Sequence, residues 1–565
     1  MKKKILIYIL LALILLGILA RILCLNNEIT AEESDFVKAA IAIAQTGHPA
    51  YYQSEQVPNE LALWHPPMYI YLLSIIPSIS NSEIMIRSLN VIFLIFTSII
   101  IFLFCLKMFD KGGKIIGLVS SSLFLINYYV LSSSLIVDID VLSMFFVFSF
   151  IYLVLLYYKT ENKACLALAA VTFVFSLANR YPIAILCYLV IGLYFIINKN
   201  NKKNKRIIPA YVLIGLLGGL AFLVIWAFYS TIIQPGTFFA FITHNINLGS
   251  QQFSSLPLYI SSFLLNGAQI IRLFTLPGVL LFIISLPSHI RKKDIFTKVI
   301  LIYTTAILLL FIIIPRPAFG YPRYFLSLMP GFFILISKYA YEKLSDISIK
   351  KEYILLSVLC GILSLFMLML LNPQLTIYQN DGLIKSTNLP DFLLNFACIL
   401  PAPLVFAFRK QERKIVTLIA ILAIFLSYNL YFDAKYVAND SPIKEAGIYL
   451  KEHTNNSEII ICPKAVGYYA ERRFYANDYT KPPLNKLSLN FFIEYISESY
   501  KNPEMDTQFF WDDDIFSGVY YSNYIKPDPN LALTKYIVLN YKCEGMDYEK
   551  KIGDYYVYNL KQEAI

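Results

Sequence analysis

Charged residues are scarce in this chain of 565 residues, and metal-ligand patterns are missing. Only 15% of the residues are Asp, Glu, Lys or Arg, against about a quarter in soluble domains, while 57% are hydrophobic. This deficit excludes an ordinary soluble protein and indicates an integral membrane protein. The 8 cysteines are scattered, and none forms a close pair with metal-ligand spacing, so the cysteines predict no metal site.

Long apolar runs account for most of the chain. We mark about thirteen apolar runs, most of them of roughly 17–25 residues and so long enough to cross a bilayer as a helix, with two somewhat shorter. They are Ile5–Cys24, Ser88–Met108, Ile115–Ser132, Val141–Tyr158, Cys165–Ala178, Tyr181–Ile197, Ile208–Ile232, Ile270–Pro287, Ile295–Ile314, Tyr324–Tyr339, Tyr353–Leu371, Phe392–Phe408 and Ile415–Tyr431. Asn179-Arg180 divides one longer run, which we interpret as two helices joined by a tight turn.

The loops between these runs predict the orientation. Lys2, Lys3 and Lys4 place the amino terminus in the cytoplasm under the positive-inside rule. Alternate threading then puts the basic loops on that side, namely 107–114, 159–163, 199–206, 291–298, 338–351 and 409–414. The formal charge of +10 lies largely in these loops, so it does not indicate nucleic-acid binding. We predict a multi-pass protein of the cell membrane with its carboxyl terminus outside.

The sequence predicts two domains. Residues 1–432 form a transmembrane domain, and residues 433–565, the tail, form an exported soluble domain. The transmembrane domain includes a first outer loop, 25–87, which also lies outside the bilayer. That tail alternates strand-like segments with a helix, so the fold class is a polytopic α-helical membrane protein with a small α/β carboxyl-terminal domain. The segments are Glu458–Cys462, Lys535–Leu539 and Asp554–Asn559, with the helix at Ile443–His453.

The first outer loop begins with a group of acids. Thr30 is a predicted helix cap with Glu33 as its capping-box partner, and the helix should end at Gly47. On the functional interpretation, Glu32, Glu33 and Asp35 crowd three carboxylates just outside the first membrane helix. Repulsion among them would make one a better proton acceptor, as a general base requires. Capping and catalysis both remain open.

Asp138 and Asp140 form a second acidic point, at the outer end of a membrane helix. Such carboxylates are costly there unless they face a cavity or a partner. The simpler interpretation is that an acid at a helix amino terminus favours the helix dipole. The spacing also resembles the Asp-x-Asp metal motif of sugar-nucleotide enzymes, which is a weak match.

Single arginines lie near the outer helix ends, at Arg87, Arg180, Arg272, Arg316 and Arg323. Some will snorkel to lipid headgroups, whereas a cluster facing one cavity would suit a phosphate. Carboxylates that deprotonate an acceptor, with arginines that hold a departing phosphate, predict a polyprenyl-phosphate sugar as substrate.

The order of these motifs resembles the GT-C glycosyltransferases, in the branch of protein mannosyltransferases and aminoarabinose transferases. The matching motifs are Glu32-Glu33, His65-Pro66-Pro67-Met68-Tyr69, Arg87, Asp140-Val141-Leu142, Arg180-Tyr181-Pro182, and Arg323-Tyr324 with Pro330. The resemblance covers roughly Ile5 to Pro330, and its specific part is the ordered spacing of short motifs.

The resemblance implies an inverting glycosyltransferase that uses a polyprenyl-phosphate-linked sugar donor, with a protein, lipid or glycan acceptor. The first-loop Asp-Glu pair of the family falls on Glu32 and Glu33, and its second acidic position falls on Asp140. The glutamate in place of the usual aspartate leaves open which acid is the base. The implied substrate-binding residues are Asp35, His65, Arg87, Asp138, Arg180, Arg323 and Tyr324. No cofactor is certain, and a divalent cation stays open.

Two other functions fit parts of the pattern. A transporter or flippase of lipid-linked or polar solutes would usually show internal repeats and polar residues at mid-membrane depth, and neither is evident. An oligosaccharyltransferase-like enzyme would carry a Trp-Trp-Asp-Tyr-Gly signature, which Trp511-Asp512-Asp513-Asp514 resembles only superficially.

Overall fold

The structure is a computed structural model whose described residues fall into two compact units. The first unit comprises residues 1–25, 65–69 and 87–438, and the second comprises 26–64, 70–86 and 439–565. The described residues are 3–26, 28–29, 31–47, 67–228, 270, 274, 278–292, 294–313, 322–344, 442–455, 458–476, 534–539, 548–553 and 555–559. The predicted spans 353–371, 392–408 and 415–431 and the predicted domain boundary at 432 lie outside them.

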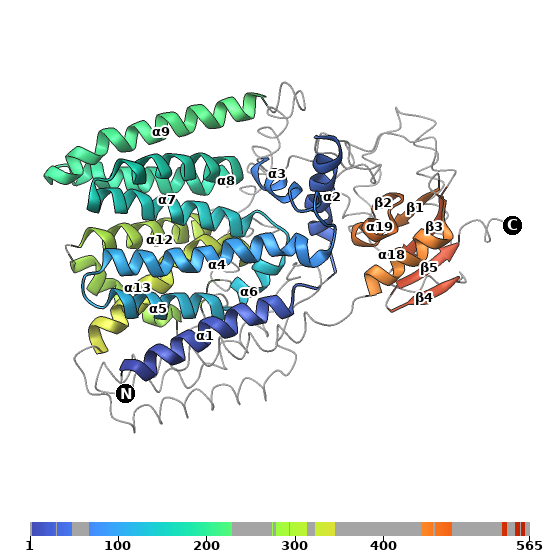
Figure 1. Cartoon of the computed structure of the whole chain (residues 1–565), viewed down its shortest axis with the longest axis horizontal. Helices are drawn as coiled ribbons and strands as arrows, with labels where there is room; N and C mark the ends of the chain where they lie inside the picture. Colours follow the sequence, from blue (N-terminus) through green and yellow to red (C-terminus); the bar gives the residue numbers. More distant parts are fainter. Residues whose placement is uncertain are drawn as a thin grey trace. The chain divides into compact units, whose positions relative to one another are not determined.

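The first unit is a bundle of long apolar helices (Figure 1). α7 packs on α8, α8 on α9, and both α1 and α13 pack on α5. The helices are α1 (Lys3–Leu23), α4 (Glu83–Met108), α5 (Gly113–Ile126), α6 (Tyr128–Leu135), α7 (Asp140–Thr160), α8 (Lys163–Ile197), α9 (Lys202–Phe228), α12 (Ile295–Ile313), the 3-10 helix η3 (Pro322–Leu328) and α13 (Met329–Leu344). The division between the units falls within α4, after Ile86.

Length and composition make several of these helices suitable for crossing a membrane. Among the described residues, four helices meet both criteria, at 83–108, 140–160, 163–197 and 202–227, and four shorter apolar helices accompany them. Large aliphatic side chains are exposed on their surfaces, for example Leu15 at 67% and Leu216 at 66%. A soluble monomer rarely exposes such an apolar surface, whereas a lipid-facing one does.

α8 is a helical hairpin, as the sequence predicts. The backbone of Arg180 leaves helical geometry, with φ −153° and ψ 80°, and Pro182 follows it. Phe173 and Tyr188 stack with their ring centroids 4.9 Å apart, although a straight helix would separate these positions by roughly 22 Å. The two halves therefore run antiparallel, which confirms the predicted tight turn.

The predicted span Ile115–Ser132 is wrong in one respect, because Asn127 interrupts it. α5 ends at Ile126 and α6 begins at Tyr128, with extended geometry at Asn127 between them. The Oδ1 of Asn127 accepts a hydrogen bond from the Val130 amide at 3.1 Å, so the side chain caps the new helix. The short α6 leads directly to the acidic segment before α7.

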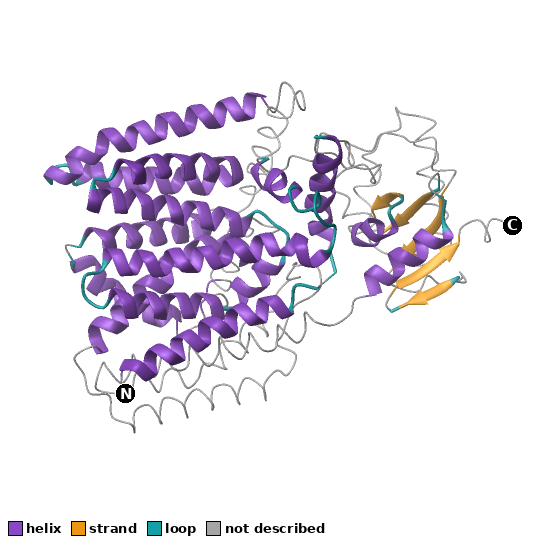
Figure 2. Ribbon diagram, in the orientation of Figure 1, coloured by secondary structure: helices purple, strands orange, loops and turns teal. Residues whose placement is uncertain are grey.

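The second unit contains a mixed five-stranded sheet (Figure 2). The strand order is β2-β1-β3-β5-β4, in which β1 is parallel to β2 and β3 while β5 is antiparallel to β3 and β4. The elements are α2 (Ala31–Thr46), α18 (Pro442–His453), β1 (Ile459–Cys462), α19 (Lys464–Ala470), β2 (Arg473–Ala476), β3 (Thr534–Leu539), β4 (Lys550–Ile552) and β5 (Tyr555–Asn559). A short helix, α3 (Met68–Ser74), precedes α4 in the chain.

The predicted elements of the tail are present at their predicted positions. α18, β1, β3 and β5 match the expected helix and strands within about one residue. α2 also ends as expected, since Gly47 follows Thr46 with φ +79°, a conformation that favours glycine. The prediction had assigned the first outer loop to the transmembrane domain, whereas the structure groups 26–64 with the tail.

Candidate functional site

One segment runs from Leu135, the last residue of α6, to Asp140, the first residue of α7. It contains the predicted site residues Asp138 and Asp140, and two more, Arg87 and Arg180, contact it. We call it the 135–140 turn. Asp138 is 6% exposed and Asp140 is 4% exposed, so both acids are buried. A buried turn must find partners for its backbone carbonyls, because bulk solvent does not hydrate them inside a bundle.

α4 supplies two of these partners from one helical face. Arg87 Nε donates to the Leu135 carbonyl at 2.7 Å. One turn further along, Asn90 Nδ2 donates to the carbonyls of Ile136 at 2.6 Å and Asp138 at 3.2 Å. Arg87 is 2% exposed, so this predicted phosphate ligand helps to hold the turn.

The hairpin of α8 supplies the other side of the turn. Asn179 Nδ2 donates to the Ile139 carbonyl at 2.9 Å. Its neighbour Arg180 forms an ion pair with Asp140, and the two side chains are 13% and 5% exposed. The helical geometry of α8 breaks at Arg180, and the hairpin formed there places Asn179 and Arg180 against the start of α7.

The capping interpretation of the two acids fits only in part. Asp140 is the first residue of α7, where a carboxylate favours the helix dipole, but Ile139 is the cap residue and makes no side-chain cap. The Oδ1 of Asp138 accepts from the Ile139 amide at 2.5 Å. Asp140 is engaged by Arg180 across the bundle, which a purely local cap would not require.

Several buried polar atoms on α4, α7 and α8 have no hydrogen-bond partner among the described residues. They are Asn90 Oδ1, Asn179 Oδ1, Ser143 Oγ and Ser176 Oγ. Ser143 lies one turn from Asp140 on α7, and Ser176 lies one turn from Asn179 on α8, so each pair shares a helix face. Buried polar groups are normally satisfied, so these atoms indicate where water or a polar ligand binds.

The acids of the first outer loop lie in the second unit. Glu33 on α2 is 1% exposed, and Asp35 is half-buried. The side chain of Glu32 and the whole of His65 lie outside the described residues, as do the side chains of Arg323 and Tyr324. The backbone of those two belongs to η3, which packs against α6, α7 and α12.

The structure thus brings together Arg87, Asp138, Asp140 and Arg180 around one turn. Asn90 and Asn179, which bind its carbonyls, were missed from the sequence. An amide side chain inside an apolar helix is unusual, and this signal could have identified both. In the residues that the structure describes, no group of three or more His, Cys, Asp and Glu side chains is arranged to hold a metal ion, and the question of a divalent cation stays open.

Arg21 is a further buried cation that the sequence analysis missed, because it lies inside the first apolar run. It is fully buried, and its Nη1 donates to the carbonyls of Gly17 at 2.5 Å and Leu125 at 2.7 Å. Leu125 is near the carboxyl end of α5, where a cation interacts favourably with the helix dipole. Ser122 Oγ also donates to the Leu10 carbonyl at 3.0 Å, so polar contacts fasten α1 to α5.

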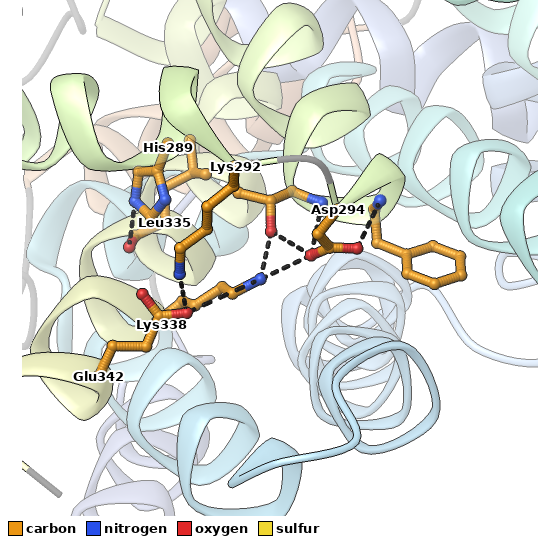
Figure 3. A network of polar contacts seen from close by, with 8 residues as sticks. His289, Lys292, Asp294, Leu335, Lys338 and Glu342 are labelled. Atoms are coloured by element: carbon orange, nitrogen blue, oxygen red, sulfur yellow. Dashed lines mark hydrogen bonds and ion pairs between the residues drawn. The ribbon is translucent and has the colours of Figure 1, made fainter. Parts of the chain in front are cut away.

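A second polar network lies at the ends of α12 and α13 (Figure 3). Lys338 Nζ contacts Asp294 Oδ2 at 2.7 Å and lies 4.0 Å above the Phe109 ring, while Lys292 pairs with Glu342. Burial opposes the charge of Asp294, but hydrogen bonds from Lys338 and Thr297 outweigh it and lower the pKa of that carboxyl. The charges of Lys292 and Lys338 balance those of Asp294 and Glu342, so we interpret this network as one that stabilises the packing of the helices.

Comparison with known proteins agrees with the resemblance seen in the sequence. The family described as dolichyl-phosphate-mannose-protein mannosyltransferase matches residues 64–227, which include Arg87, Asp138, Asp140 and Arg180. No curated protein matches the chain in sequence.

Two solved structures have the same fold over most of the chain. ArnT from Cupriavidus metallidurans bound to undecaprenyl phosphate is 12% identical, covers 97% of each chain and gives a TM-score of 0.61. The apo state of that protein is also 12% identical, covers 87% of this chain and 90% of its own, and gives a TM-score of 0.57. The chain is thus similar in sequence to that mannosyltransferase family over residues 64–227, and it shares the fold of ArnT over most of its length.

Proposed function

We propose that the chain is an inverting glycosyltransferase that moves a hexosyl or pentosyl group from a polyprenyl-phosphate donor to an acceptor at the outer face of the membrane. The observation that carries the proposal is the buried Asp140–Arg180 ion pair at the start of α7, on helices that also carry buried polar atoms without a hydrogen-bond partner among the described residues. Intramembrane charges are expensive and therefore mark functional sites.

The donor class has separate support. ArnT, which shares this fold, has been solved with undecaprenyl phosphate, a polyprenyl phosphate. A lipid-linked donor keeps its tail in the bilayer while its phosphate and sugar reach a polar site at a helix end. Arginine suits such a phosphate because its charge is permanent and its donors bind two oxygens together.

The reaction needs a base, a stabilised leaving group and alignment. An acceptor hydroxyl attacks the anomeric carbon and gives its proton to a carboxylate of the first outer loop, Glu32, Glu33 or Asp35. The bond from the anomeric carbon to the phosphate oxygen breaks, and the polyprenyl phosphate leaves with the electron pair. Arg180, oriented by Asp140, then stabilises the negative charge that develops on the phosphate.

The test is transfer of radiolabelled sugar from a panel of polyprenyl-phosphate donors by the purified full-length protein. We expect turnover by the wild type and its loss in one or more of Glu32→Gln, Glu33→Gln and Asp140→Asn. The matched control is Asp110→Asn, because the Asp110 carboxylate is 90% exposed and pairs with Lys159 on the surface of the described structure.

Two outcomes would contradict the proposal. One is a wild type that neither binds nor consumes any donor in the panel. The other is turnover that all three active-site substitutions leave at the level of Asp110→Asn. Retention of stereochemistry at the anomeric carbon would reject the inverting mechanism but not the transfer of sugar.

A further inference from the structure

The second unit joins the first outer loop to the tail, although the two are about 400 residues apart in the sequence. α2 packs against α19, which follows β1 in the tail. The packed residues of α2 include Val37 and Ala40, both 0% exposed. The helix that carries Glu33 and Asp35 is therefore built into the tail domain's own body.

A polar cluster fixes the start of α2, and we call it the Tyr469 latch. The Tyr469 hydroxyl accepts a hydrogen bond from the Ile29 amide at 2.8 Å and donates to Glu83 Oε1 at 3.3 Å. Lys444 Nζ pairs with the same Glu83 oxygen at 2.8 Å and lies 5.6 Å from the centre of the Tyr469 ring. Ile29 and Glu83 thus meet at the Tyr469 hydroxyl, and Lys444 joins them through the Glu83 carboxylate.

The latch acts on the backbone and so controls the helix that follows. Ile29 is fully buried and lies two positions before the first residue of α2. Its amide precedes the helix and needs a partner outside it, which Tyr469 provides. Burial raises the pKa of the Tyr469 hydroxyl, with the Ile29 contact opposing and Glu83 adding, so the group keeps its proton at neutral pH.

We propose that Tyr469 is a positioning residue that fixes the start of α2 and thereby the direction of Glu33 and Asp35. The tail domain then takes part in the reaction by holding the acids of the first outer loop. The catalytic half of this inference rests on the proposed function, whereas the structural half does not.

Hydrogen exchange on the full-length protein tests the structural half. Tyr469→Phe keeps the ring and removes both hydrogen bonds, so amides in residues 29–40 should exchange about fivefold faster, the equivalent of about 1 kcal/mol. The matched control is Tyr449→Phe, which removes a 2.7 Å hydrogen bond to Glu549 within the same domain. Equal exchange in residues 29–40 for the two variants and the wild type would overturn the inference.

Donor turnover by the same proteins tests the catalytic half. We expect Tyr469→Phe to lower kcat at least tenfold with little change in KM for the donor, because positioning of the base affects the chemical step. Tyr449→Phe should retain wild-type kcat. Equal kcat for both variants would reject a catalytic role for the latch.

The two experiments separate failure of this inference from failure of the proposed function. A wild type that consumes no donor would refute the proposed function, while the exchange result would still decide whether Tyr469 holds α2. A Tyr469→Phe variant that unfolds would exchange fast over β1, β3 and β5 as well as over α2. In that case Lys444→Met, which leaves the tyrosine hydroxyl in place, replaces it as the test of the latch.

Discussion

Replacing Asp140 with Asn should leave Arg180 as a largely buried cation without its carboxylate. The two side chains are 5% and 13% exposed, so water screens the pair poorly. Removing one partner of a buried pair typically costs about 3–5 kcal/mol, because the remaining charge is uncompensated. Arg180→Met should cost a similar amount by leaving the carboxylate alone.

The double variant Asp140→Asn/Arg180→Met separates a structural role from a catalytic one. Removing both charges should recover most of the lost stability, which gives a coupling free energy of about 3 kcal/mol in a double-mutant cycle. Transfer of sugar should stay at least roughly 100-fold below wild type, because the phosphate then lacks its cation. Unfolding in mixed detergent micelles measures the stability, and donor turnover measures the transfer.

Either of two results would refute this reasoning. Single variants as stable as the wild type would mean that the pair is not buried in the folded protein. Full recovery of turnover in the double variant would mean that the pair only supports the fold, and the proposed phosphate role of Arg180 would fail with it.

Three further substitutions test the packing and polar contacts of the first unit. Asn90→Leu should destabilise the protein by about 1–3 kcal/mol, because two carbonyls of the 135–140 turn lose their donor, and unfolding in micelles would detect this. Gly17→Val should destabilise it more than Leu15→Val, since a Cβ at Gly17 would meet the Leu125 carbonyl oxygen at 2.8 Å while Leu15 is exposed; equal midpoints would contradict this. The pKa of Asp294 is lower in the folded protein than in the unfolded chain, so the Asp294 carboxylate adds to the free energy of unfolding above about pH 4. This contribution is lost as the pH falls through the pKa of the folded state. Asp294→Asn should therefore make the free energy of unfolding less dependent on pH at acid pH.

The sequence predicted the helical bundle because its signals are local. An apolar run that spans a bilayer must satisfy its backbone groups as a helix, and α7 and α12 match their predicted runs closely. The α8 hairpin was predictable because Asn179-Arg180 and Pro182 interrupt an apolar run. Asn127 gave a similar signal in the run before α6, but a single amide is tolerated in many helices, so its effect depends on the neighbours.

The missed parts depend on contacts between distant segments. β2 and β4 have 4 and 3 residues, and each is defined by its pairing with another strand rather than by its own pattern. Asn90 and Asn179 acquire their role only when α4 and α8 meet at the 135–140 turn. The contact of Ile29 with Tyr469 spans 440 positions, and no local pattern could indicate it.

The composition of the second unit constrains how often the chain crosses the membrane. α2 packs with α19, and Glu83 pairs with Lys444, so we infer that the first outer loop and the tail lie on one side of the bilayer. The chain must therefore cross an even number of times between Ile86 and Asn439. Twelve predicted spans follow the first one, and this even number agrees with the requirement. If the α8 hairpin counted as one span, the number would be eleven, which is odd.

Cysteine labelling with a membrane-impermeant maleimide on intact cells tests this topology. Gln45→Cys on α2 and Ile448→Cys on α18 replace exposed residues and should label equally, with the native cysteines of the wild type as background. Asn200→Cys, exposed between α8 and α9, should label only after permeabilisation, because the basic loop 199–206 is predicted on the other side. Labelling of Gln45→Cys and Ile448→Cys from opposite sides would contradict the even count. Labelling of all three variants from one side would instead contradict the interpretation of α8 as two membrane spans. If α8 crossed the membrane only once, residue 200 would lie on the same side as α2.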